Sequence, residues 1–148
     1  MSLNDTIGHM LDSKPRKVWS VARGTSVFDA LSLMADEDVG AVLVMDSDRL
    51  LGVMSERDYA RKVILSGKSS RETQVEEIMS EPRIATRSTT VDECMREMTV
   101  TRTRHMPVVE NGQVLGVVSI GDLVNWVISA QERTISDLHA YVSGSYPG

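Results

Sequence analysis

The chain has 148 residues, of which 41% are apolar and 25% are charged, and it carries a formal net charge of −5. This is an ordinary globular composition without the run of about 18 apolar residues that a membrane span needs, so we expect no membrane partner. The single cysteine excludes an intrachain disulfide, and the N-terminal residues lack the pattern of a secretion signal. Both features predict a cytoplasmic protein, and the acidic balance disfavours nucleic acid as a partner.

The first half of the chain predicts five elements in the order strand, helix, strand, strand, helix. An extended segment at residues 17–21 precedes a helix whose apolar residues recur with helical spacing over residues 27–34. Two short apolar runs, at residues 41–45 and 50–54, are typical of buried strands in a hairpin. A second helical stripe over residues 59–64 completes the unit.

The second half of the chain predicts the same order of elements. An extended segment at residues 83–85 precedes a helix over residues 91–98, and the Asn-Gly pair at residues 111–112 predicts the tight turn of a hairpin. The apolar stripe of the next helix covers residues 123–128. A further helix is expected to open at Thr134, and its narrow apolar stripe fits either a partner subunit or its own domain.

The two halves are copies of one unit. Residues 42–58 recur as residues 106–122, at an offset of 64 residues and without a gap. A unit of about 60 residues buries too little surface to be stable alone, so we expect the copies to pack face to face with pseudo-two-fold symmetry and clefts between them. The sequence therefore predicts a mixed α/β (α+β) fold. The expected segments are 7–66 for the first repeat, 67–74 for a linker, 75–131 for the second repeat, and 132–148 for a C-terminal helix and tail.

Each copy closes with the motif Gly-Val-x-Ser-x-x-Asp, at residues 52–58 and 116–122. The motif lies where a strand meets a helix, so a phosphate could bind the backbone N–H groups and the aspartate could hold the hydroxyls of a ribose. Ser-x-x-Asp is also a capping box, which stabilises a helix start by about 1 kcal/mol without binding a ligand. The glycine favours binding, because a glycine inside a strand often marks the close approach of a ligand or of a neighbouring segment.

Basic residues cluster beside both motifs. Arg57, Arg61 and Lys62 lie in or after the first motif, and Arg104 and His105 lead into the strand that precedes the second. Such side chains are candidate phosphate clamps, with arginine suited to bidentate contacts. The alternative is a solvated surface on which these cations pair with neighbouring carboxylates.

The sequence indicates neither a metal site nor a catalytic centre. The three histidines lie far apart without the spacing of metal ligands, and Cys94 falls on the apolar stripe of a helix, where a thiol packs rather than reacts. No nucleophile, base and orienting group can be assembled from the candidate residues, so we expect no enzymatic activity.

The duplicated unit, closed twice by the same motif, resembles a pair of cystathionine β-synthase (CBS) domains, or Bateman module, over roughly residues 7–131. The chain is similar to the small stand-alone CBS-pair proteins of bacteria. The resemblance implies regulatory binding of an adenosine compound between the repeats, with AMP as the first candidate and ATP, NAD or S-adenosylmethionine as others. It also implies a homodimer.

The resemblance assigns roles to particular residues. The side chains expected to hold ribose hydroxyls are those of Asp58 and Asp122, and those expected to approach phosphate are Ser55 and Ser119. The backbone expected to face adenine belongs to Ser20, Val21, Gly40, Ala41, Ile84, Ala85, Met106 and Pro107. The candidate site also includes Val53, Arg57, Arg104, His105 and Gly121.

One departure from the family pattern predicts that the two sites differ. The family usually has Ser or Thr immediately before the aspartate, whereas this chain has Arg57 in the first copy and Gly121 in the second. Arginine could supply a stronger phosphate contact, while glycine leaves only a backbone N–H group.

The leading hypothesis is a non-enzymatic adenine-nucleotide sensor that reports its occupancy to an unidentified target protein through a conformational shift. The alternative is an interaction protein whose nucleotide sites are vestigial and whose C-terminal helix and dimer surface contact the target. A third class, nucleic-acid binding through Arg102 and Arg104, is disfavoured by the composition.

Overall fold

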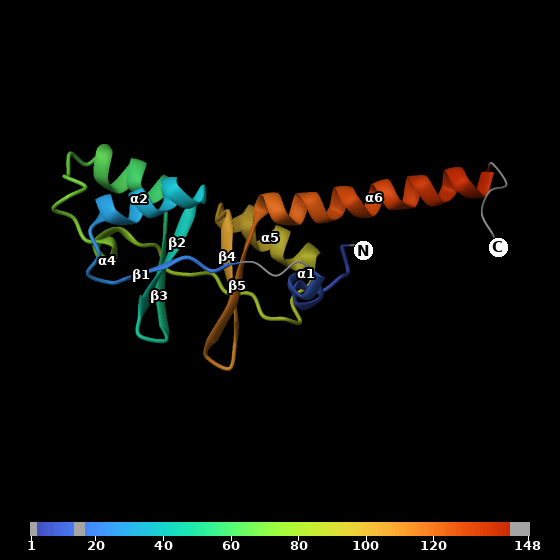
Figure 1. Ribbon diagram of the computed structural model, residues 1–148, viewed down its shortest axis with the longest axis horizontal. Coiled ribbons are helices and arrows are strands. Elements are labelled where there is room, and N and C mark those ends of the chain that lie inside the picture. The colour runs from blue at the N-terminus through green and yellow to red at the C-terminus, as the bar shows by residue number, and fades with distance from the viewer. Residues whose placement is uncertain (1–2, 14–16, 143–148) are drawn as a thin grey trace.

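The computed structural model describes residues 3–13 and 17–142, without the side chains of residue 137 and residues 140–142. Two small α/β units lie side by side, and one long helix extends well beyond them (Figure 1). The predicted duplication and the mixed fold class are confirmed. The predicted tail at the end of the segment 132–148 lies outside the described residues, which end at residue 142.

Unit 1 is built from the first repeat around a three-stranded sheet. Its strand order is β1-β2-β3, with β1 parallel to β2 and β2 antiparallel to β3. Its elements are β1 (Ser20–Ala22), α2 (Val27–Glu37), β2 (Ala41–Asp46), β3 (Arg49–Ser55), α3 (Glu56–Tyr59) and the π-helical turn η1 (Ala60–Ile64). Helix α2 starts where its periodicity predicts, because the Ser26 side chain accepts a hydrogen bond from the N–H of Asp29.

Unit 2 is built mainly from the second repeat. Its elements are α5 (Val91–Thr101), β4 (His105–Glu110), β5 (Gln113–Ser119) and α6 (Ile120–Val142). Strands β4 and β5 form the predicted hairpin, with Asn111 and Gly112 at positive φ in the turn. The strand expected at residues 83–85 is reduced to one parallel bridge between Ala85 and Val108.

Each unit contains the first helix of the other repeat. Helix α1 (Ile7–Ser13), at the start of the first repeat, packs in the core of unit 2 through Ile7, Met10 and Leu11. Helix α4 (Val75–Ile78), at the start of the second repeat, packs in the core of unit 1. Backbone hydrogen bonds anchor each exchange. Among them, the N–H groups of Ile7 and Gly8 donate to the carbonyls of residues 89 and 87, and those of residues 27 and 75 donate to the carbonyls of residues 73 and 25.

The motif glycines accommodate these exchanged segments. A Cβ atom on Gly52 would lie 2.7 Å from Sδ of Met79 and 2.9 Å from the carbonyl oxygen of Ser80. A Cβ atom on Gly116 would lie 3.2 Å from a methyl carbon of Leu11. The close approach expected at each glycine is therefore that of a neighbouring segment, not that of a ligand.

The C-terminal helix differs from its prediction. Helix α6 is continuous over 23 residues and begins at the second motif, so no separate helix opens at Thr134. The Thr134 hydroxyl donates to the carbonyl of Ala130 inside the helix instead of capping a new one. Leu123 and Ala130 face the core, whereas Ile135 and Leu138 are 63% and 60% exposed on the projecting half. Among the described residues, no helix is both long and apolar enough to cross a bilayer.

Candidate functional site

Two cavities lie between the repeats and share a wall. Cavity 1 has a volume of about 770 Å³ and cavity 2 of about 450 Å³. Gly40, Val53 and His105 line both cavities. A Cβ atom on Gly40 would lie 3.4 Å from Cε1 of His105, so the glycine leaves room for the imidazole at this wall.

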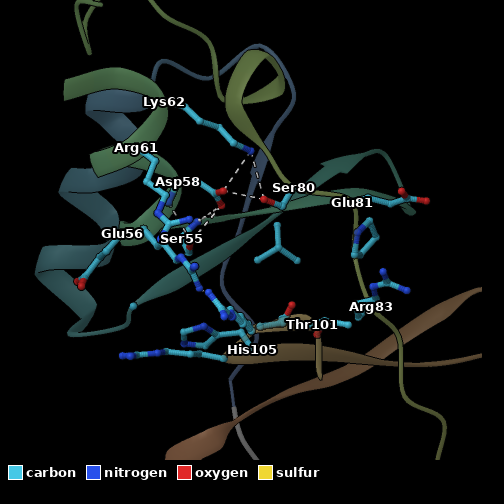
Figure 2. A pocket seen from close by; sticks show the side chains of 17 residues that line it. Ser55, Glu56, Asp58, Arg61, Lys62, Ser80, Glu81, Arg83, Thr101 and His105 are labelled. Atoms are coloured by element: carbon cyan, nitrogen blue, oxygen red, sulfur yellow. Dashed lines mark hydrogen bonds and ion pairs between the residues drawn. The ribbon is translucent and has the colours of Figure 1, made fainter. Parts of the chain in front are cut away.

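Cavity 1 contains the first Ser-x-x-Asp motif (Figure 2). The N–H of Asp58 donates to Oγ of Ser55 at 3.2 Å, and the N–H of Ser55 donates to Oδ2 of Asp58 at 2.9 Å. The other carboxylate oxygen, Oδ1, accepts a 2.6 Å hydrogen bond from the Ser80 hydroxyl and lies 3.2 Å from Nζ of Lys62. The capping box is therefore real, and Asp58 is the centre of a network that joins three segments of the chain.

Cavity 2 contains the second motif. The N–H of Ser119 donates to Oδ2 of Asp122 at 2.8 Å, and the N–H of Asp122 donates to Oγ of Ser119 at 3.1 Å. The capping alternative is thus realised in both copies. It does not exclude binding, because all four motif side chains also line a cavity.

The cavities bring together ten of the seventeen candidate residues. Cavity 1 is lined by Gly40, Val53, Ser55, Arg57, Asp58, Arg104 and His105, and cavity 2 by Gly40, Ala41, Val53, His105, Ser119 and Asp122. The candidate residues that line neither cavity are Ser20, Val21, Ile84, Ala85, Met106, Pro107 and Gly121. Most of them lie on or beside strands whose backbone is engaged: the Ala85 N–H, for example, donates to the Pro107 carbonyl at 2.9 Å.

The structure adds residues that sequence reasoning missed. Ser80 and Arg83 line cavity 1, and Lys17, Trp19 and Asp38 line cavity 2. The sequence held a partial signal for the first pair, because Ile78-Met79, which lies just before it, corresponds to Met10-Leu11 near the start of the chain. That correspondence does not say on which repeat a segment packs.

Arg57 links the two sides of cavity 1. Its Nη1 atom donates a 2.8 Å hydrogen bond to the backbone carbonyl of Arg102. Arg57 follows strand β3 of unit 1, while Arg102 ends helix α5 of unit 2 in a left-handed conformation. The contact is exposed, so solvent screens it and a ligand can replace it.

His105 is the titratable group of the shared wall. Burial lowers the pKa of its imidazole below 6.5, and Arg104 acts in the same direction, while Asp122 and Glu56 oppose the shift. The neutral form is therefore favoured at neutral pH.

We expect the stability of the protein to depend on His105 in mildly acidic solution. Its pKa is lower in the folded chain than in the unfolded chain, so its contribution to stability is complete above pH 6.5 and is lost as the pH falls through the folded-state pKa. Between pH 7.5 and pH 5.5, the free energy of unfolding in urea should decrease less for His105→Gln than for the wild type. Equal losses in the two proteins would contradict this assignment.

The described residues hold no group of three or more His, Cys, Asp or Glu side chains that could bind a metal ion. His9 lies instead against Trp126, with ring centroids 5.8 Å apart. Burial raises the pKa of the Cys94 thiol to about 11, and its sulfur contacts that of Met106 at 3.5 Å. Cys94 is therefore a core residue, as its position on the helical stripe predicts.

Comparison with known proteins identifies the family. The sequence profile of the CBS domain matches the chain twice, at residues 14–64 and 75–129. A solved structure of a protein with CBS domains from Burkholderia ambifaria has a TM-score of 0.81 and 46% identity, and covers 85% of this chain and 96% of that one. The chain therefore belongs to the CBS-domain family and carries a CBS pair, a class of modules that are generally regulatory and bind ligands.

Two plant relatives show that such pairs occur in proteins of different length. The mitochondrial CBS domain-containing protein CBSX3 of Arabidopsis thaliana is 36% identical over 152 residues, which cover 95% of this chain and 73% of that protein. CBSCBSPB2 of the same plant is 36% identical over 119 residues, which cover 79% of this chain and only 22% of that protein. Within the family, the pair thus occurs both in small proteins and as a minor part of long ones.

Proposed function

We propose that this protein is a non-catalytic regulator that binds an adenine nucleotide between its two repeats. The observation that carries the proposal is cavity 1, where the Ser55–Asp58 motif and a cluster of cations from both repeats line one volume of about 770 Å³. AMP is the first candidate, and ATP, NAD and S-adenosylmethionine are the others.

Asp58 fits the role of a ribose acceptor that the fold holds in place. A carboxylate has about four acceptor positions, and Oδ1 of Asp58 faces the Ser80 hydroxyl and Lys62 at the cavity surface. A ribose hydroxyl would join or replace the Ser80 hydroxyl at this oxygen. The phosphate would then lie toward the arginines on the opposite side.

Ligand binding would report through the two units. A nucleotide in cavity 1 contacts residues of both repeats, so it favours one arrangement of the units over others. The proposed target is a protein, and the proposed assembly is a homodimer in a reducing, cytoplasm-like compartment.

Calorimetric titration of ligand-free protein with the four compounds tests the proposal. We expect micromolar binding of at least one compound. Asp58→Asn should weaken binding at cavity 1, and Asp122→Asn at cavity 2, each by about tenfold or more, because each loses a charge-assisted hydrogen bond to the ribose.

Asp29→Asn is the matched control. Asp29 occupies the same position after a capping serine, Ser26, but lies exposed on α2 and lines neither cavity. Its substitution should leave binding unchanged. Failure of all four compounds to bind would reject the sensor and favour the interaction protein with vestigial sites, for which the exposed Ile135 and Leu138 of α6 offer a contact surface.

A further inference from the structure

We propose that cavity 1 selects its ligand by the number of phosphate groups and takes an adenosine diphosphate or triphosphate in preference to AMP. This preference rests on the proposed function and deepens it, because it concerns the same site. Its basis is a set of cations, drawn from both units, that one phosphate group is too small to satisfy.

The side chains that line cavity 1 have a surplus of three positive charges, although the whole chain carries −5. None of the residues outside the described ranges has an acidic side chain, so none of their side chains can lower this surplus. Like charges around one cavity repel each other unless an anion lies between them, so the cavity favours an anionic ligand. The lining consists of three carboxylates, Glu56, Asp58 and Glu81, and of six cations, Arg57, Arg61, Lys62, Arg83, Arg102 and Arg104.

Three of the six cations are engaged by the protein. Lys62 belongs to the network around Asp58, with its Nζ atom 3.2 Å from the carboxylate. Arg57 donates to a backbone carbonyl of unit 2, and Nη1 of Arg83 lies 3.8 Å from a carboxylate oxygen of Glu97. A ligand that used these three side chains would have to share them with their present partners.

The other three cations are available to a ligand. No hydrogen bond or ion pair to another described residue occupies the guanidinium groups of Arg61, Arg102 and Arg104. The carboxylates of Glu56 and Glu81 form no ion pair with a described residue either, so they do not neutralise these arginines by direct contact. The three guanidinium groups can therefore bind an anion without first breaking an internal contact.

A single phosphate group satisfies only part of this set. A phosphate monoester carries about −1.5 to −2 charges at pH 7 and offers three terminal oxygens. A guanidinium group in fork geometry binds two oxygens, so two arginines already use all the oxygens of one phosphate. A second or third phosphate group supplies the oxygens for the third arginine and the negative charge that the remaining surplus requires.

The available arginines lie on both sides of cavity 1. Arg61 follows Asp58 by about one helical turn in unit 1 (Figure 2), whereas Arg102 and Arg104 lie between α5 and β4 of unit 2. A chain of two or three phosphates can extend from the first side to the second. The volume of about 770 Å³ leaves room for it, since ligand pockets usually have about 300–1,000 Å³.

Titration calorimetry with AMP, ADP and ATP tests this preference, in EDTA so that no divalent cation neutralises the phosphates. We expect ADP and ATP to bind at least about tenfold more tightly than AMP at low salt. Added NaCl should weaken ATP binding more than AMP binding, because each further charge is screened. Asp58→Asn should weaken this ATP binding and Asp122→Asn should not, which assigns the binding to cavity 1.

Two arginine variants test which side chains count the phosphates. Arg102→Asn and Arg104→Gln should each lower the ATP affinity by about tenfold and the AMP affinity by less than about threefold, because AMP has fewer oxygens for these side chains. Asparagine is used at position 102 because it tolerates the left-handed conformation there, with φ at 57°. Arg133→Gln, on the exposed part of α6, removes the same charge away from the cavity and should change neither affinity.

The outcomes separate this preference from the proposed function. Equal affinities for AMP and ATP, a ratio of ATP to AMP affinity that neither arginine variant lowers, or ATP binding that depends on Asp122 instead of Asp58 would overturn the preference alone. Tighter binding of S-adenosylmethionine than of ATP would also overturn it and leave the sensor standing. Failure of every adenosine compound to bind would overturn both.

Discussion

Replacing Ile7 by alanine is expected to destabilise unit 2, although Ile7 belongs to the first repeat by sequence. Its side chain is fully buried in a cluster that includes Val91, Met106 and Leu123. Truncation of a buried isoleucine to alanine costs about 2–5 kcal/mol, because apolar contacts are lost and a cavity remains. The free energy of unfolding in urea should fall by this amount.

Hydrogen exchange locates the effect and supplies the control. Because the two cores are separate clusters, Ile7→Ala should lower amide protection mainly in β4 and β5. Ile78→Ala removes the equivalent side chain, which is 1% exposed in the core of unit 1, and should act mainly on β2 and β3. The opposite pattern, with Ile7→Ala exposing β2 and β3, would contradict the exchange of helices.

Replacing Gly52 by valine is expected to have the second large effect. Even a Cβ atom at this position would lie 2.7 Å from Sδ of Met79 and 2.9 Å from the carbonyl oxygen of Ser80. The Met79 side chain can move, but the carbonyl belongs to the bridge between Val53 and Ser80, whose two hydrogen bonds fix the exchanged segment. Overpacking of this kind costs about 1–3 kcal/mol, and we expect the upper end.

Substitutions at two other glycines serve as controls for this prediction. Gly24→Ala should change the unfolding free energy by less than about 0.5 kcal/mol, because no atom lies within 4 Å of its added Cβ. Gly116→Ala should fall between the two, since its Cβ meets only a flexible methyl group of Leu11 at 3.2 Å. A Gly52→Val protein as stable as the wild type would show that the segment around Ser80 is not held by β3.

The repeat and its elements were predictable because they depend on local patterns. Apolar periodicity located α2 and α5, and the Asn-Gly pair located the β4–β5 turn. The exchange of α1 and α4 was not predictable, because equivalent segments of a repeat have equivalent patterns and either core could bury them. The continuity of α6 was missed because Thr134 fits a cap as well as a helix interior, where its hydroxyl bonds the carbonyl four residues earlier.

The site was predictable where it depends on the motif and not where it depends on packing. Both serines and both aspartates of the motif line cavities, while their binding roles stay predictions. The role of the glycines was open between a ligand and a neighbouring segment, and only the positions of Met79 and Leu11 decide it. Ser80 and Asp38 were missed because they reach the cavities through tertiary contacts that no local pattern encodes.

Helix α6 begins in cavity 2 and ends far from it. Its first residues follow Ser119, which lines the cavity, and its projecting half carries the exposed Ile135 and Leu138 (Figure 1). A helix of 23 residues is roughly 35 Å long. A tilt of about 5° at the cavity end would therefore move the far end of the helix, with its exposed apolar residues, through roughly 3 Å.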